Sequence, residues 1–123
     1  MSKDIKILAI IPARMGSSRF PGKPMAKILG TPMIEHVYKN VSSCKDLTKT
    51  VVASCDNEII EHIHSIGGHA VLTSIEHERA SDRCTEALHI LERQDKTKYN
   101  IIVMVQGDEP MTTSDMISQA IYP

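Results

Sequence analysis

Residues 50–74, TVVASCDNEIIEHIHSIGGHAVLTS, contain the pattern that decides the fold. The stretch begins and ends with short apolar runs, TVVAS and AVLTS, of the kind found in strands that are covered on both faces. Between them, isoleucines recur at helical spacing from about Asn57, and the pattern stops at Gly67 and Gly68. A strand, a helix and a second strand joined by short links predict a right-handed unit with parallel strands.

The same alternation continues on both sides of this unit. Residues 5–11 (IKILAII) and 101–105 (IIVMV) are two further apolar runs, nearly without interruption, that predict buried strands. Helical patterns fill the intervals between the runs, and the links are short. The sequence therefore predicts an α/β fold with a doubly wound, mainly parallel sheet.

Four helices are expected beside these strands. The first opens at Thr31 with Pro32 in its first turn, the third starts near Ser81, and the fourth starts near Thr113. The side chains expected to face the core are Met33, Ile34, Val37, Val41, Ile59, Ile60, Ile63, Ile66, Cys84, Ala87, Leu88, Leu91, Met116, Ile117 and Ala120.

Length and composition indicate one globular domain over residues 1–123. The chain is 41% hydrophobic and 24% charged, and its net charge of −1 argues against nucleic acid as a partner. No apolar run approaches the length of a membrane span, so no membrane partner is expected. Cys44, Cys55 and Cys84 are odd in number and widely spaced, which favours reduced thiols in the cytoplasm over a disulfide framework.

The predicted sheet indicates where a ligand binds. In open parallel sheets, ligands bind beyond the carboxyl ends of the strands. The loops at that edge are residues 12–30, 55–57, 74–81 and 106–112. Three of these loops contain irregular polar sequence, which predicts a single site at this edge.

The loop PARMGSSRFPGKP, residues 12–24, contains three cations and no acid. Two glycines allow the backbone to approach a ligand, and Arg14, Arg19 and Lys23 can make charge-assisted hydrogen bonds to phosphate oxygens. The loop is not a Walker P-loop, because its glycine spacing is one residue too long and Pro24 replaces the metal-binding Ser or Thr. A phosphate-binding loop is the favoured interpretation, and a solvated basic turn remains the alternative.

The segment QGDEP, residues 106–110, supplies the opposite charge at the same edge. Asp108 follows a buried strand next to a glycine, where its carboxylate can bind a hard cation such as Mg²⁺. The alternative role for Asp108 is a turn residue that caps the next helix, and a structural role is favoured for Glu109. His77, on an edge loop, is the one histidine kept as a site candidate.

Three segments together resemble a known family. They are IIPARMGSSRFPGKPMAKILGTPMIEHV at 10–37, GGHAVLTSIEHERASDRCTEAL at 67–88 and VMVQGDEPM at 103–111. In combination they resemble the N-terminal half of 3-deoxy-manno-octulosonate cytidylyltransferases, the CMP-Kdo synthetases. The resemblance implies a Rossmann-like sheet of the nucleotide-diphospho-sugar transferase type, here apparently truncated.

The resemblance also implies a reaction, its cofactor and its partners. In that family, CTP and an acidic eight-carbon sugar such as Kdo give CMP-sugar and pyrophosphate with magnesium, for lipopolysaccharide or capsule synthesis. The anomeric hydroxyl of the sugar attacks the α-phosphorus of CTP. A homodimer is expected for the full-length protein, and a half-length chain is expected to lack activity by itself.

The site residues are transferred by position in the matching motifs. Arg79 and Ala80 replace the Ser and Gly usual in the family, and ASCD at 53–56 has one residue more than the usual ATD. The matching positions are Ala13, Arg14, Ser17, Arg19, Lys23 and Arg83 for nucleotide binding, Gln106 for nucleotide and sugar, and Asp108 for magnesium, with Arg14, Lys23 and Asp108 as the catalytic set.

Two other interpretations stay open. The first loop also resembles that of spore-coat polysaccharide and acylneuraminate cytidylyltransferases, although QGDEP and PGKP favour the octulosonate group. The second interpretation belongs to a different class of protein: a nucleotide-binding module that binds the nucleotide without catalysing a reaction.

Overall fold

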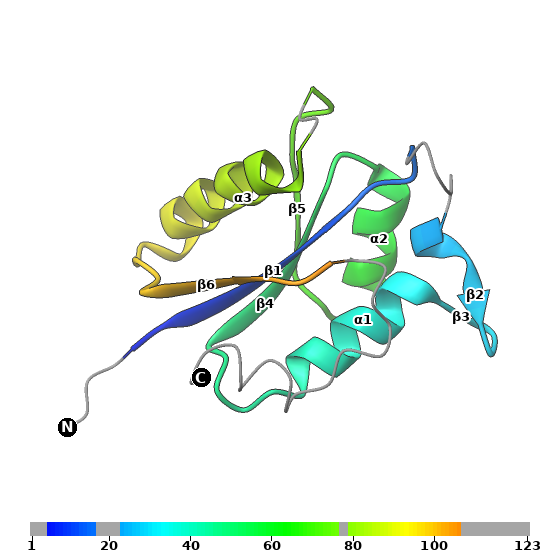
Figure 1. Ribbon diagram of the computed structural model, residues 1–123, viewed down its shortest axis with the longest axis horizontal. Helices are drawn as coiled ribbons and strands as arrows, with labels where there is room; N and C mark the ends of the chain where they lie inside the picture. Colours follow the sequence, from blue (N-terminus) through cyan, green and yellow to red (C-terminus); the bar gives the residue numbers. More distant parts are fainter. Residues whose placement is uncertain (1–4, 17–22, 77–78, 107–123) are drawn as a thin grey trace.

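The computed structural model describes residues 5–16, 23–76 and 79–106, and a parallel four-stranded sheet forms its centre (Figure 1). The strand order is β5-β4-β1-β6, so the first strand lies inside the sheet and the chain builds outward from it in both directions. This confirms the predicted doubly wound parallel sheet. The strands are β1 (Ile7–Ala13), β4 (Lys49–Ser54), β5 (Ala70–Leu72) and β6 (Ile101–Met104).

Helices cover both faces of the sheet. α1 (Met33–Ser42) and α2 (Asn57–Ser65) pack on one face, and α3 (Ala80–Asp95) packs on the other (Figure 1). Alternate side chains of β1 enter the two layers, because successive residues of a strand point to opposite faces. The buried layer under α1 and α2 contains Ala9, Ile11, Ile34, Val37, Val41, Val52, Ile59 and Ile63. The layer under α3 contains Leu8, Ile10, Val51, Ala53, Val71, Cys84, Ala87 and Leu91.

The boundaries of the strands differ from the prediction by one or two residues. β1 covers residues 7–13 rather than 5–11, because it pairs with β4 as far as Ala13 and Ser54. β5 ends at Leu72 rather than at residue 74. The fourth helix expected from Thr113 lies outside the described residues.

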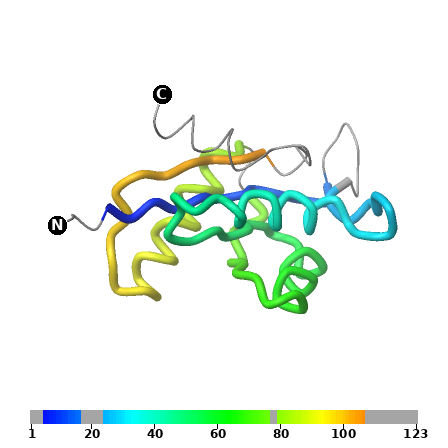
Figure 2. The backbone as a smooth tube through the Cα atoms, turned by 90° about the horizontal axis from the view of Figure 1, so that it is seen from below, coloured from blue at the N-terminus to red at the C-terminus, as the bar shows by residue number. Residues whose placement is uncertain are grey.

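A small hairpin, which the sequence did not predict, precedes α1. After a short 3₁₀ turn (η1, Lys23–Met25), β2 (Lys27–Ile28) pairs antiparallel with β3 (Thr31–Pro32). The expectation that the helix opens at Thr31 was therefore wrong: the helix starts at Met33. In both views the hairpin projects from the end of the molecule opposite the link between α3 and β6 (Figures 1 and 2).

Two residues with positive φ explain the hairpin. Leu29 has a φ of 54° and Gly30 a φ of 84°. A two-residue turn with both angles positive joins antiparallel strands closely, so Thr31 and Pro32 are drawn into pairing before the helix begins. Asn, Asp and Gly favour this conformation, whereas leucine does not, and the side chain of Leu29 is 97% exposed.

We predict that Leu29→Asn stabilises the protein by about 0.5–1 kcal/mol, because asparagine adopts positive φ at lower cost and little apolar burial is lost. The free energy of unfolding from urea titration measures the effect. Ile75→Asn is the control, since Ile75 is also exposed but has no positive φ. Equal changes in the free energy of unfolding of the two variants would show that the positive φ of Leu29 does not lower the stability of the protein.

Candidate functional site

The strand order fixes the position of the candidate site. From β1 the chain moves to β4 and β5, and then returns past β1 to form β6 on the other side. The direction of winding therefore reverses between β1 and β6, and ligands of such sheets bind at this reversal, beyond the carboxyl ends of the strands. The loops that follow β1 and β6 both leave from this edge.

Pro12 ends the contact between these two strands. β6 pairs with β1 up to Ile10 and Met104, and the Val105 N–H then donates to the Ile10 carbonyl at 3.0 Å. Two residues later, Pro12 occupies the equivalent position on the β6 side of β1 and has no N–H to donate. The ladder cannot continue there, so the pairing of β1 with β6 ends at the predicted ligand edge.

Two side chains expected at the site lie at this edge and are exposed. Arg14 follows the last residue of β1, and Gln106 is the second residue after β6. Ala13, the other residue expected here, is buried as the last residue of β1 and pairs with Ser54. An exposed guanidinium next to a buried strand end is free to contact an anionic ligand.

The loop after β1 is bonded to the end of β4. The Met15 N–H donates to the Asp56 carboxylate (Oδ2) at 2.8 Å. The Asp56 N–H in turn donates to Ser54 Oγ at 3.0 Å, and Ser54 is completely buried. The position of the loop backbone next to Arg14 therefore depends on Ser54 and Asp56 at the end of β4, which we call the β4 corner.

The loop after β5 is bonded to the same corner. The Thr73 N–H donates to the Ser54 carbonyl at 2.8 Å, and the Ser74 N–H donates to Glu86 Oε1 of α3 at 2.9 Å. Together with the Met15–Asp56–Ser54 bonds, these contacts form one network across β1, β4, β5 and α3. We call it the edge network; its members are Met15, Ser54, Asp56, Thr73, Ser74, Arg83 and Glu86.

Arg83 belongs to this network through a buried guanidinium. Its side chain donates from Nη1 to Thr73 Oγ1 at 2.6 Å and to the Ser74 carbonyl at 3.2 Å, and the residue is only 3% exposed. A buried charge needs such partners, because desolvation without hydrogen bonds is costly. The structure thus places Arg83 at the predicted edge, and the contacts described fix the loop after β5.

The residues that depart from the family pattern lie at the start of α3. Arg79 occupies the N-cap position with extended backbone, and its side chain makes an exposed ion pair with Asp82 at 3.3 Å. Ala80 is the first residue of the helix. An exposed pair of this kind contributes little to stability, so this stretch can vary without loss of the fold.

The remaining predicted site residues are described only in part. Lys23 lies in η1, at the end of the loop of residues 12–24, which we call the basic loop. Ser17, Arg19, His77 and Asp108 lie outside the described residues. Sequence reasoning did not name Ser54, Thr73 or Glu86 as site residues, and it placed Asp56 at the ligand edge only as part of the loop 55–57. The available signal was that Ser54 and Thr73 lie in the last two residues of the predicted strands 50–54 and 70–74.

The described parts of the chain contain no cluster of metal ligands, and two of the three cysteines are buried. Among residues 5–16, 23–76 and 79–106, no group of three or more His, Cys, Asp and Glu side chains is arranged to hold a metal. Cys44, Cys55 and Cys84 form no disulfide, and burial raises the pKa of Cys84 to about 11, which keeps that thiol protonated.

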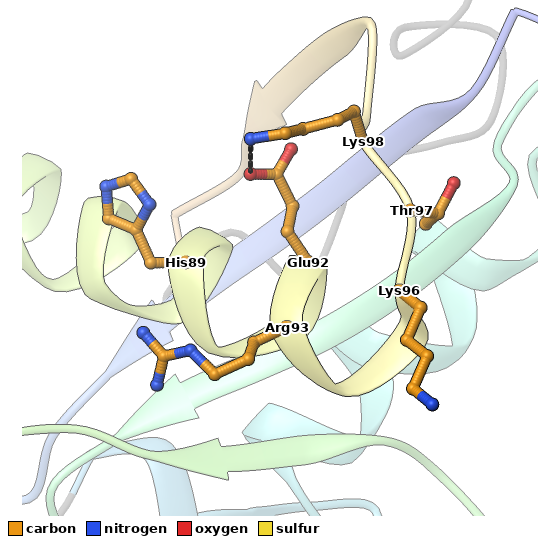
Figure 3. A pocket seen from close by; sticks show the side chains of 6 residues that line it. All are labelled: His89, Glu92, Arg93, Lys96, Thr97 and Lys98. Atoms are coloured by element: carbon orange, nitrogen blue, oxygen red, sulfur yellow. Dashed lines mark ion pairs between the residues drawn. The ribbon is translucent and has the colours of Figure 1, made fainter.

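A groove beside α3 lies away from the candidate site. Figure 3 shows its lining, and Lys98 Nζ lies 3.7 Å from Glu92 Oε1 across it. The groove has a volume of about 390 Å³ and lies where α3 leads into the amino end of β6, opposite the ligand edge. The lining residues are His89, Glu92, Arg93, Lys96, Thr97 and Lys98.

A carboxylate between two helices supports the layer beneath the site. Glu35 of α1 accepts hydrogen bonds from Lys39 Nζ at 2.6 Å and from His62 Nε2 of α2 at 2.7 Å. The bond from Lys39, followed by that from His62, lowers the pKa of the Glu35 carboxyl below its ordinary value of 4.5. The ionised form of Glu35 therefore holds α1 and α2 together.

Comparison with known proteins identifies the class of this chain. The family model described as cytidylyltransferase matches residues 8–122, so the chain belongs to the cytidylyltransferase family. The 3-deoxy-manno-octulosonate cytidylyltransferase of Trichlorobacter lovleyi is 46% identical over 119 residues, and that of Geobacter metallireducens is 43% identical. The 8-amino-3,8-dideoxy-manno-octulosonate cytidylyltransferase of Shewanella putrefaciens is 42% identical over 117 residues. The predicted membership of this family is confirmed.

Solved structures agree with this assignment. CMP:2-keto-3-deoxy-manno-octonic acid synthetase complexed with CTP matches 94% of this chain with a TM-score of 0.85 and 36% identity. A nucleotidyl transferase from Methanothermobacter, at 16% identity and a TM-score of 0.71, shares the fold. The match to the Trichlorobacter relative covers 97% of this chain but 45% of the relative, so the chain spans about half the length of such proteins.

No helix within the described residues is long and apolar enough to cross a lipid bilayer.

We predict that Glu35→Gln lowers the free energy of unfolding by about 1–2 kcal/mol near pH 7, since hydrogen bonds to a charged group are lost. Because the folded-state pKa is lowered, this contribution is complete above pH 4.5 and is lost as the pH falls through the folded value. The difference between wild type and variant should therefore shrink toward pH 3 in urea titrations. Glu58→Gln, at an exposed first-turn position of α2, is the control. A difference that stays constant with pH would exclude the ionised carboxylate as its source.

Proposed function

We propose that this chain forms the CTP-binding half of a cytidylyltransferase that activates Kdo or a close relative. The observation that carries the proposal is the exposed Arg14 at the winding reversal between β1 and β6, on a loop bonded to the β4 corner. A relative named for the octulosonate reaction is 46% identical, which supports this substrate class. The amino-substituted sugar is an equally acceptable member of the class, given the Shewanella relative.

The basic loop would bind the triphosphate of CTP. Arg14, Arg19 and Lys23 supply cations, and hydrogen bonds to charged groups contribute about 1.5–3 kcal/mol each. Ser17 adds a hydroxyl donor to the same loop. The other proposed contacts are Ala13 and Arg83 on the nucleotide side and Gln106 toward both nucleotide and sugar.

Magnesium is the proposed cofactor, held by the carboxylate of Asp108 after β6. An oxygen ligand after a strand at the ligand edge suits a hard cation. When bound, the ion would reduce the charge of the triphosphate. A solved relative is complexed with CTP, and the triphosphate of CTP offers oxygen ligands to such an ion, so Asp108 is the residue to test.

In the proposed reaction, the anomeric oxygen of the sugar forms a bond to the α-phosphorus of CTP. The bond from that phosphorus to pyrophosphate breaks, and the hydroxyl proton is released. Arg14 and Lys23 would stabilise the charge that develops on the phosphates and on the leaving pyrophosphate. Positioning and electrostatics supply most of the rate enhancement in phosphoryl and nucleotidyl transfer.

The cellular setting follows from the same class. We place the protein in the cytoplasm, where free thiols are kept reduced, and in the synthesis of lipopolysaccharide or capsule. The full-length protein would act as a homodimer.

A second candidate is a nucleotide-binding unit without turnover. The chain spans about half the length of the relatives that it matches, and the nucleotide contacts proposed above would serve either candidate. Release of pyrophosphate from CTP, Kdo and magnesium separates the two candidates when the chain is extended to the full length of its relatives, since only an enzyme produces it.

We predict that this chain binds CTP with magnesium, and that Arg14→Ala, Lys23→Ala and Asp108→Ala each raise the dissociation constant at least tenfold. The loss corresponds to one charge-assisted hydrogen bond or metal contact. Calorimetric titration measures it, with ATP as the competing nucleotide. Lys45→Ala is the control, because Lys45 is exposed and lies after α1, away from the ligand edge. If CTP binds no better than ATP, or if the control weakens binding equally, the basic loop is not the nucleotide site.

A further inference from the structure

Asp56 accepts a bond that its position in the chain does not explain. It is the N-cap residue of α2, where an aspartate ordinarily accepts hydrogen bonds from the first turn of its own helix. In this protein the Asp56 side chain makes no such capping bond. Its Oδ2 instead accepts the Met15 N–H, 41 residues away in the sequence, at 2.8 Å.

The charge of Asp56 is also unexpected at this place. A carboxylate bonded to the backbone of a loop that binds phosphates repels an anionic ligand. Electrostatics alone therefore predicts that loss of Asp56 improves nucleotide binding. A geometric role that outweighs this repulsion explains why a carboxylate occupies the position.

The surroundings of Asp56 are suited to a geometric role. Its own N–H is held by Ser54 Oγ at 3.0 Å, and its carbonyl accepts the N–H groups of Ile59 and Ile60 at the start of α2. Ser54 is fully buried at the end of β4. The Asp56 backbone is thus fixed to the sheet and to α2. Its carboxylate therefore accepts the Met15 N–H from a fixed point, which restricts the position of the Met15 backbone.

We propose that Asp56 is a positioning residue for the nucleotide: its carboxylate holds the Met15 amide so that Arg14 and Gly16, on either side, are presented at the ligand edge. This inference rests on the function proposed above. A loop that is held before the ligand arrives loses less conformational entropy on binding. No role in proton transfer or in contact with the substrate is assigned to Asp56.

The test compares Asp56→Ala and Asp56→Asn with Glu58→Ala. Asparagine keeps a carbonyl oxygen that can accept the Met15 N–H, whereas alanine does not. Glu58 is exposed in the first turn of the same helix, so its removal deletes the same charge nearby without touching the loop. Wild type and the three variants are titrated with CTP and magnesium in the calorimeter.

Asp56→Ala is expected to raise the dissociation constant for CTP about tenfold, and Asp56→Asn to raise it less than about threefold. Glu58→Ala should leave the constant unchanged or lower it slightly. Binding by Asp56→Ala that is as tight as wild type, or tighter, would overturn the inference, as would failure of asparagine to rescue.

Hydrogen exchange of the Met15 amide gives a readout that does not depend on CTP. In Asp56→Ala this amide should exchange at least tenfold faster than in wild type, while amides in the centre of β1 keep their protection. Unchanged protection of Met15 would also overturn the inference. If wild-type protein fails to bind CTP, the proposed function falls and the nucleotide role of Asp56 falls with it. If wild type and Asp56→Ala bind CTP equally, only the inference falls.

Discussion

The complete burial of β1 is the constraint on which the rest of the structure depends. Five consecutive residues, Ile7 to Ile11, are at most 2% exposed, and they alternate between two apolar layers. A strand buried on both faces requires helices on both sides of the sheet and neighbours on both edges. α1 and α2 meet the first requirement on one side and α3 on the other, and β4 and β6 meet the second. The winding reversal next to β1, and with it the ligand edge, follows from this arrangement.

The sequence predicted this architecture because each strand is an almost unbroken apolar run and each helix has a separate apolar stripe. Those patterns are local, and the handedness of parallel connections then leaves few arrangements. The hairpin before α1 was not predicted for a physical reason. Its turn begins with Leu29 in a positive-φ conformation, where the usual sequence signal is Asn, Asp or Gly. The interpretation of Pro32 as a first-turn residue was reasonable from local sequence, but pairing with Lys27 overrode it.

The sequence predicted which loops lie at the site, but it did not predict which residues are hydrogen-bonded there. Topology placed Arg14 and Gln106 at one edge, because both follow parallel strands. The bond between Met15 and Asp56 joins residues 41 positions apart, and no local spacing encodes it. The same holds for Arg83, which the family resemblance assigned to the nucleotide and whose described hydrogen bonds reach Thr73 and Ser74. Such pairings depend on the register of strands, which the sequence leaves open until the sheet is formed.

The edge network connects these observations. Its bonds run from Met15 through Asp56 and Ser54 to Thr73, and the guanidinium of Arg83 completes it from α3. Each bond joins a loop to the end of a strand or to a helix that packs on the core. The first residues after β1 and β5, Met15, Thr73 and Ser74, are therefore held by hydrogen bonds to parts of the chain that pack around the core. Because a site ordered in advance avoids the entropic cost of arranging its donors, the core that determines the fold would also contribute to the phosphate affinity that we propose for this loop.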